Sequence, residues 1–234
     1  MTETRLECIA VALDTDDRDT YSDWCGLFGP RVGVLKVGPR VVLRWGRDAV
    51  REAAATGADV FLDMKFHDIP STVAGAVGAA KELGVTYLTV HAGGGRRMLE
   101  AAAEEAGDEV RVLGITVLTH LDADDLRDLD LPGAAGDRVL SWAGSAKAAG
   151  CAGVVCSPLE LATLRARLGP ELLLVSPGIR FEAGPGAAVA DDQRRVASPS
   201  AALRAGADLL VIGRPLTQAP DPETALAALA EACE

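Results

Sequence analysis

Lysine is scarce in this chain, although arginine is common. Of the 23 lysines and arginines, only Lys36, Lys65, Lys81 and Lys147 are lysines. Arginine therefore supplies the ordinary surface charge, yet Lys36 and Lys65 lie at the ends of apolar runs. Arginine stays protonated at any working pH, whereas a buried lysine can have its pKa shifted and release a proton. The pattern indicates that these two lysines serve chemistry rather than solubility.

Positive charge is in short supply overall. The formal net charge of −11 argues against a general binder of nucleic acid or of an anionic membrane, because both need a basic face. The negative net charge is still compatible with a local cationic pocket for an anionic metabolite. No apolar run approaches the ~20 residues that span a bilayer. Residues 1–7 lack the basic and apolar regions of a signal peptide, so we expect a cytoplasmic protein.

A disulfide or zinc framework is also missing. The five cysteines, an odd number, contain no Cys-x-x-Cys pair. This is typical of reduced thiols in a cytosolic protein, and we expect all five to be buried in the core. We accordingly expect no metal ligands among them.

What the sequence does contain is a strand–helix rhythm repeated about eight times. Helix-like stretches that are rich in alanine separate the strand-like apolar runs, and several end at a glycine. The predicted strands are Ile9–Leu13, Val32–Val37, Val60–Leu62, Tyr87–Val90, Val110–Leu118, Gly153–Cys156, Leu172–Val175 and Leu209–Ile212. The predicted helices include Val41–Ala55, Thr72–Leu83, Met98–Ala106, Arg138–Ala149, Leu159–Leu168 and Glu223–Cys233. Continuous apolar strands alternating with helices favour an α/β fold with a parallel sheet, here a (β/α)₈ TIM barrel.

No linker or composition shift marks a boundary, so we expect residues 1–234 to form a single domain. One stretch rich in glycine, alanine and proline, Phe181–Asp192, is predicted to be a loop after the seventh strand.

Catalytic groups of such barrels lie at the C-terminal ends of the strands. Strands one to four place Asp14, Lys36, Asp63, Lys65 and His91 there, although His91 is more typical of a structural histidine. Strands seven and eight add Pro177, Gly178, Arg180, Gly213 and Arg214. Glycines with an arginine after strands seven and eight match the place where many barrels hold a phosphate. The residues therefore predict an enzyme that acts on a phosphorylated anionic metabolite.

One segment, residues 63–72, concentrates the charges. Asp63 and Lys65 share one face of a strand because side chains alternate, and Asp68 and Thr72 follow. Charges at this density cost desolvation energy and persist only when they are paired or needed for chemistry.

Together these residues resemble the orotidine 5′-monophosphate decarboxylase family along nearly the whole chain. The most specific likeness is Asp63-x-Lys65-x-x-Asp68-Ile69-x-x-Thr72. Further matching segments occur in the same order at residues 11–14, 36–38, 89–92, 117–119, 177–180, 192–195 and 211–215. The resemblance implies a homodimer of (β/α)₈ barrels that uses neither a metal nor an organic cofactor.

The resemblance also implies roles for individual residues. Lys36, Asp63, Lys65 and Asp68 would form a charged tetrad in which Lys65 is the proton donor. Asp68 and Thr72 would reach into the neighbouring subunit's site. The implied substrate contacts are Asp14 to the ribose, Gln193, Gly213 and Arg214 to the phosphate, and Thr119, His120 and Pro177 along the pocket.

Two departures from the family pattern accompany the resemblance. His120 stands where many members have a small hydroxyl residue that reads the pyrimidine ring, so Thr119 or a water could make that contact. The loop before Gln193 is longer than usual. The alternatives are a magnesium-dependent sugar-phosphate decarboxylase or aldolase on the same barrel, and a non-catalytic barrel that binds nucleotide. Lys36 argues against the first, because it stands where those enzymes tend to carry a carboxylate metal ligand.

Overall fold

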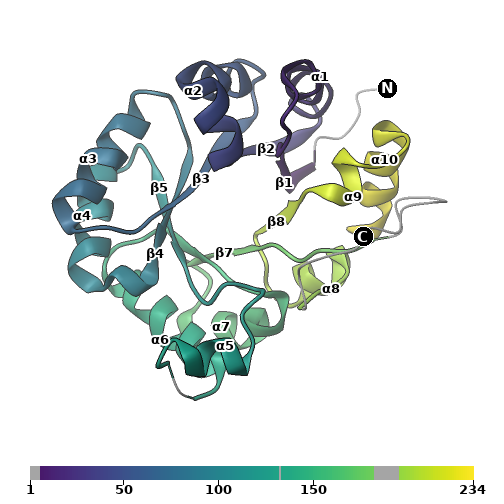
Figure 1. The fold of residues 1–234 in the computed structure, drawn as a ribbon. Coiled ribbons are helices and arrows are strands. Elements are labelled where there is room, and N and C mark those ends of the chain that lie inside the picture. Colours follow the sequence, from purple (N-terminus) through teal and green to yellow (C-terminus); the bar gives the residue numbers. More distant parts are fainter. Residues whose placement is uncertain (1–5, 132, 182–194) are drawn as a thin grey trace.

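Eight parallel strands close into a barrel in which each strand pairs with the next and β8 pairs with β1 (Figure 1). The computed structural model describes residues 6–131, 133–181 and 195–234. The strands are β1 (Leu6–Ala12), β2 (Val32–Val37), β3 (Asp59–Phe66), β4 (Tyr87–His91), β5 (Arg111–Ile115), β6 (Gly153–Val155), β7 (Leu173–Ser176) and β8 (Leu209–Ile212). The predicted α/β barrel is therefore confirmed.

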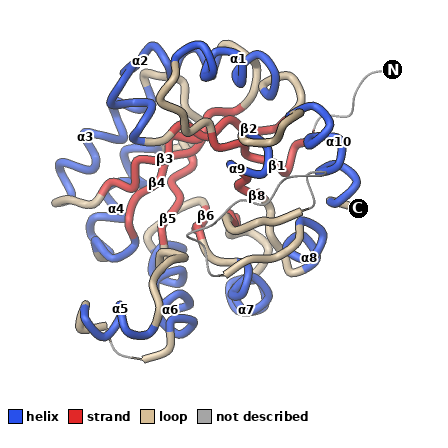
Figure 2. Tube along the Cα trace, turned by 45° about the vertical axis from the view of Figure 1, so that its right-hand side comes forward, coloured by secondary structure: helices blue, strands red, loops and turns tan. Residues whose placement is uncertain are grey.

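Helices surround the strands as an outer ring, which Figure 2 shows in a second view. They are α1 (Arg18–Phe28), α2 (Pro39–Ala54), α3 (Pro70–Lys81), α4 (Arg96–Ala106), α5 (Ala123–Asp128), α6 (Ala135–Ala148), α7 (Leu161–Leu168), α8 (Pro199–Arg204), α9 (Arg214–Thr217) and α10 (Pro222–Ala232). Two short 3₁₀ turns, η1 (Ala92–Gly94) and η2 (Pro158–Glu160), precede α4 and α7. Proline at the start of α2, α3, α8 and α10 suits the first helical turn, where its missing N–H is not needed.

The fifth strand is shorter than its apolar run predicts. The strand ends at Ile115, whereas the run Val110–Leu118 continues beyond it. Val117 is still buried, so its hydrophobicity reflects a covered segment after the strand rather than strand structure. A buried apolar run does not by itself distinguish a strand from a packed loop. Asp122, in an acidic stretch before and within α5, caps this helix through a reciprocal pair with Asp125.

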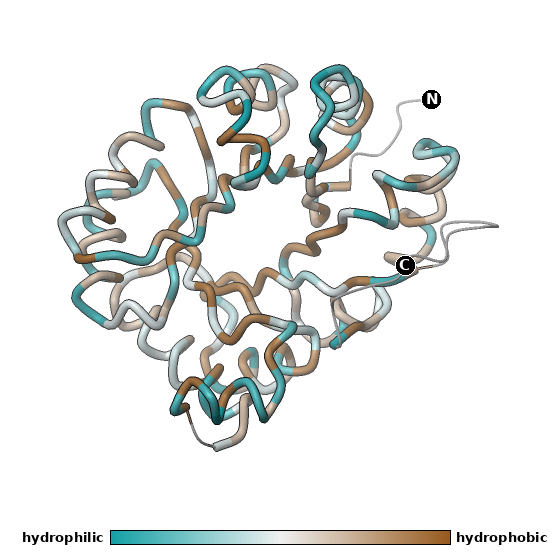
Figure 3. The backbone as a smooth tube through the Cα atoms, in the orientation of Figure 1, coloured by the Kyte–Doolittle hydropathy of each residue, from teal (hydrophilic) through white to brown (hydrophobic). Residues whose placement is uncertain are grey.

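Apolar side chains fill the space between the strands and the helix ring, and the tube in Figure 3 is brown along much of the barrel wall. A smaller cluster lies inside the barrel and consists of Ala10, Val34, Phe61, Tyr87, Leu113, Val175 and Leu209. Side chains two residues apart on a strand share a face, so the same rule places Ala12, Lys36, Asp63, Thr89, Ile115, Pro177 and Val211 in the next interior layer. The barrel interior thus changes from apolar to charged between Val34 and Lys36 on β2 and between Phe61 and Asp63 on β3.

Three of the five cysteines are buried, as expected, but Cys8 and Cys233 are only partly covered. They are close enough for the Cys233 thiol to donate a hydrogen bond to Cys8, which lowers the pKa of Cys8 to about 7. In the part of the chain that the structure describes, no helix is both long and apolar enough to cross a bilayer.

Candidate active site

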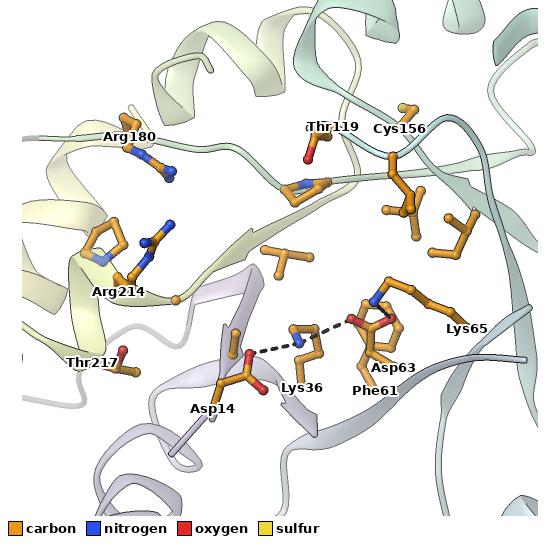
Figure 4. Close-up of a pocket in the computed structure, with 18 of the residues that line it drawn as sticks. Asp14, Lys36, Phe61, Asp63, Lys65, Thr119, Cys156, Arg180, Arg214 and Thr217 are labelled. Carbon is orange, nitrogen blue, oxygen red and sulfur yellow. Dashed lines mark hydrogen bonds and ion pairs between the residues drawn. The ribbon is translucent and has the colours of Figure 1, made fainter. Parts of the chain in front are cut away.

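A continuous chain of opposite charges follows the ends of the first three strands (Figure 4). Lys36 Nζ lies 3.5 Å from Asp14 Oδ2 and 3.3 Å from Asp63 Oδ2. Lys65 Nζ lies 2.8 Å from Asp63 Oδ1. Asp63 is therefore held between two ammonium groups, one on each carboxylate oxygen. The structure brings together four of the residues that the sequence places at the strand ends.

The two inner members of this chain are buried and stay ionised. Burial lowers the pKa of Lys36, but the carboxylates of Asp63 and Asp14 outweigh burial, so its pKa lies above the ordinary value. Burial raises the pKa of Asp63, but Lys36 and Lys65 outweigh burial and hold it below the ordinary value. Opposite charges at these distances favour the charged form of each partner. Lys65 is more accessible, with 39 % of its side chain exposed, and it faces the cavity.

The backbone around Lys65 is unusual. Pairing between β3 and β4 changes register between Leu62 and Phe66, and Lys65 has a φ of +50°. Few residues other than glycine adopt this left-handed conformation. The sequence gives no sign of this conformation, because it accompanies a change in the register of β3 against β4.

A cavity of about 350 Å³ opens beside the charged chain. Eight of the predicted site residues line it: Asp14, Lys36, Asp63, Lys65, Thr119, Pro177, Gly213 and Arg214. Its volume falls at the lower end of the range for small-molecule sites. Among the described residues, no cluster of three or more histidine, cysteine or acidic side chains could hold a metal ion.

Two arginines occupy the end of the cavity opposite Lys65, where Figure 4 shows the guanidinium groups of Arg180 and Arg214 approaching each other. Burial and the neighbouring charge of Arg214 both lower the pKa of Arg180. Two cations held this close favour an anion between them. Sequence reasoning gave Arg180 no substrate contact, although its position after strand seven was the signal that could have assigned one.

Three of the predicted residues lie outside the cavity. His120 is exposed and does not line the cavity, although Thr119 before it does. Asp68 and Thr72 are also exposed and lie outside the cavity. Gln193 lies outside the described residues, as does the predicted loop Phe181–Asp192 beyond Phe181 itself.

Both ends of that undescribed segment are attached to the barrel. Ile179 and Ala197 form a parallel bridge, with Arg180 N–H donating to the Ala197 carbonyl at 2.9 Å. Arg195 is mostly buried and bonds to Glu160 Oε1 at 2.8 Å and to the carbonyl of Leu121 at 3.0 Å. Arg195 thus attaches the chain after that segment to Glu160 and Leu121.

His91 agrees with the structural role that its position suggests. Its ring stacks on His67 with centroids 5.0 Å apart, and it meets the edge of Trp142. Its Nδ1 accepts the backbone N–H of Gly93 at 3.1 Å. Burial, with His67 and Lys65 nearby, lowers the pKa of His91, so it is neutral at pH 7.

Residues 8–229 match the model of the orotidine 5'-phosphate decarboxylase / HUMPS family. The chain belongs to this family of enzymes.

Relatives support the membership along almost the full length. An orotidine 5'-phosphate decarboxylase from Thermobifida fusca (strain YX) is 50% identical over 225 residues, which is 95% of this chain and 94% of the relative. One from Anaeromyxobacter sp. (strain K) is 48% identical over 224 residues, covering 96% and 97%. The crystal structure of orotidine 5'-phosphate decarboxylase from Lactobacillus acidophilus superposes with a TM-score of 0.83 at 33% identity, covering 97% of this chain and 99% of that one.

Proposed function

We propose that the protein converts orotidine 5′-monophosphate to uridine 5′-monophosphate in pyrimidine nucleotide biosynthesis, without a metal or organic cofactor. The observation that carries the proposal is the alternating chain Asp14–Lys36–Asp63–Lys65 on one side of a cavity with two arginines at its other end. Family membership and the curated relatives support the same reaction.

Lys65 has the central role in the proposed chemistry. Loss of CO₂ from C6 of the pyrimidine leaves a carbanion with no adjacent electron sink, so the protein must stabilise that charge. An ammonium placed beside C6 stabilises it electrostatically and then delivers the replacing proton. Asp63 holds the Lys65 ammonium at 2.8 Å and would lie next to the substrate carboxylate. Repulsion between the two carboxylates would ease as CO₂ leaves, a smaller contribution than the preorganised lysine.

The rest of the cavity fits the rest of the nucleotide. Arg214 and Arg180 would hold the phosphate, with Gly213 beside them and Gln193 as a further ligand. Asp14 would bind a ribose hydroxyl, while Thr119 and Pro177 would line the base. Because His120 does not line the cavity and Thr119 does, we assign the ring contact to Thr119. Binding energy from the distant phosphate would then organise the reacting end.

Asp68 and Thr72 would complete the site of a second subunit. Both are exposed in this chain, and so is Ile69 between them, with 64% of its surface exposed. An interface over this segment would cover Ile69 and bring Asp68 to the partner's Lys65. We therefore propose a homodimer. Its five cysteines without a Cys-x-x-Cys pair fit a reducing cytoplasm, which we propose as its location.

The test follows the ultraviolet absorbance of orotidine 5′-monophosphate with protein purified from a host that lacks its own decarboxylase. An excess of chelator is present throughout. We expect conversion to uridine 5′-monophosphate that Lys65→Ala abolishes. The matched lysine variant Lys147→Ala should leave it unchanged, because Lys147 contacts Leu168 and Glu171 away from the cavity. Binding without turnover would favour a nucleotide-binding barrel, and turnover of sugar phosphates only with magnesium would favour the aldolase branch.

A further inference from the structure

Thr89 on β4 is a buried polar residue in contact with the charged chain. Its side chain has no solvent exposure and does not line the cavity. Its hydroxyl donates to Asp63 Oδ1 at 3.0 Å and accepts the backbone N–H of Lys65 at 2.9 Å. One hydroxyl group thus contacts both the carboxylate and the lysine that the proposed reaction uses.

The register of β3 explains why the Lys65 N–H needs this partner. Leu62 pairs with Leu88 and Phe66 pairs with Val90, so three residues of β3 lie opposite the single residue Thr89. The regular ladder is interrupted here, and a buried N–H without an acceptor costs about 1–3 kcal/mol. The hydroxyl of Thr89 supplies that acceptor at the residue whose φ is +50°.

The hydrogen bond from the Lys65 N–H also leaves the proton of the Thr89 hydroxyl available to Asp63. A threonine hydroxyl has one proton to donate and two lone pairs. Since the Lys65 N–H occupies a lone pair, the proton is free to go to Asp63, where the Lys65 ammonium already contacts the same oxygen at 2.8 Å. Three hydrogen bonds thus connect Thr89, Asp63 and Lys65 in a closed set. The Lys65 backbone N–H donates to the Thr89 hydroxyl, that hydroxyl donates to the Asp63 carboxylate, and the Lys65 ammonium donates to the same carboxylate.

We propose that Thr89 is a positioning residue that aims the Lys65 ammonium, by holding the Lys65 backbone and the Asp63 carboxylate with one hydroxyl group. The inference rests on the proposed function, since it assigns a cause to the placement of the proton donor. Thr89 touches no substrate and acts only through its two neighbours. Valine keeps the shape of threonine but offers neither bond, whereas serine offers both.

The kinetic test compares Thr89→Val with Thr89→Ser. Displacing a catalytic group by about 1 Å can cost ~100-fold in rate, so we expect Thr89→Val to lower kcat by about that factor and Thr89→Ser to recover most of it. The dissociation constant of uridine 5′-monophosphate should change less than about threefold, because the arginines are untouched. Binding can be followed by intrinsic tryptophan fluorescence, since Trp24, one of the three tryptophans, lines the cavity. Loss of the hydroxyl donor also raises the pKa of Asp63, so the acid limb of kcat should move to higher pH in Thr89→Val.

Thr116→Val is the matched control for losing a buried hydroxyl. Thr116 is equally buried, and its hydroxyl donates to the Val155 carbonyl at 2.7 Å, away from the charged chain. We expect it to lower thermal stability without moving the acid limb. Equal shifts in both variants, or a wild-type kcat and pH profile in Thr89→Val, would overturn the proposal.

A second measurement does not depend on turnover. Hydrogen exchange at the Lys65 amide should be about tenfold faster in Thr89→Val than in the wild type, as expected for one lost hydrogen bond, and near normal in Thr89→Ser. If the wild type fails to decarboxylate but the amide behaves in this way, the proposed function fails while the positioning contact stands. Unchanged exchange in Thr89→Val would overturn the contact itself.

Discussion

At the scale of single residues, the site depends on charges that neutralise one another inside the barrel. Lys36 and Asp63 have side chains only 9% and 11% exposed, and each keeps its charge because the other is about 3.3 Å away. Such pairs add little net stability relative to apolar packing, but removing one partner is costly. The array is better understood as an arrangement that positions the Lys65 side chain beside Asp63 than as a source of stability.

Asp63→Asn tests this arrangement through the dependence of stability on pH. The folded-state pKa of Asp63 is held below its ordinary value of 3.8, so its stabilising contribution is present above that pH and is lost as pH falls through the folded-state pKa. We expect Asp63→Asn to cost about 3–5 kcal/mol at pH 7, because it leaves Lys36 and Lys65 with one carboxylate fewer. The measurement is denaturant unfolding between pH 7 and pH 3, where the variant should lose less stability than the wild type.

Asp16→Asn provides the comparison at an exposed carboxylate. Asp16 is 58% exposed and bonds to Arg44 on the surface, so we expect a change below about 1 kcal/mol at pH 7. Equal costs for the two substitutions, or parallel pH curves for Asp63→Asn and the wild type, would mean that the buried array does not hold Asp63 ionised.

At the scale of elements, a close backbone contact accompanies the change of register between β1 and β2. β1 and β2 change register between Leu6 and Ala10, and Gly33 on β2 lies against this irregular stretch. A Cβ atom at Gly33 would lie 2.2 Å from the backbone oxygen of Glu7. Glycine is needed here for close approach of two backbones, not for an unusual φ.

Two glycine-to-alanine substitutions should therefore have opposite effects. Gly33→Ala forces β1 and β2 apart, and we expect it to destabilise the protein by at least about 1–3 kcal/mol, as overpacking does. Gly144→Ala lies within α6 with no atom within 4 Å of the added Cβ, and we expect a gain of about 0.5–1 kcal/mol. Thermal unfolding of both variants measures the difference. A stable Gly33→Ala would show that the two strands can separate without cost.

At this scale, features that depend on the local sequence pattern could be predicted, whereas features that depend on pairing with a neighbouring strand could not. The barrel followed from alternating apolar strands and helices, and Lys36, Asp63 and Lys65 followed from the rule about strand ends. The left-handed Lys65 and the role of Thr89 arise from the register between β3 and β4, which no local pattern encodes. His120 is a different case, because its expected place came from the family pattern: it is exposed and does not line the cavity, whereas Thr119 before it does.

At the scale of the whole molecule, one chain provides most of a site but not all of the predicted tetrad. Asp14, Lys36, Asp63 and Lys65 line the cavity, whereas Asp68 is exposed on the segment that also exposes Ile69. A two-fold dimer places the same segment of each subunit against the other, so each site would receive Asp68 from its partner. A monomer would then lack one member of the charged array.

Mixing two inactive variants tests this arrangement. If a site uses its own Lys65 and the partner's Asp68, a heterodimer of Lys65→Ala and Asp68→Ala has one intact site and one with both defects. Random reassociation makes about half of the dimers mixed, with one of two sites active, so we expect about one quarter of wild-type activity. A mixture of Lys65→Ala with Lys36→Ala is the matched control, because both residues belong to the same chain's cavity and each mixed site keeps one defect. No recovery despite demonstrated heterodimers, or equal recovery in both mixtures, would mean that Asp68 does not cross between subunits.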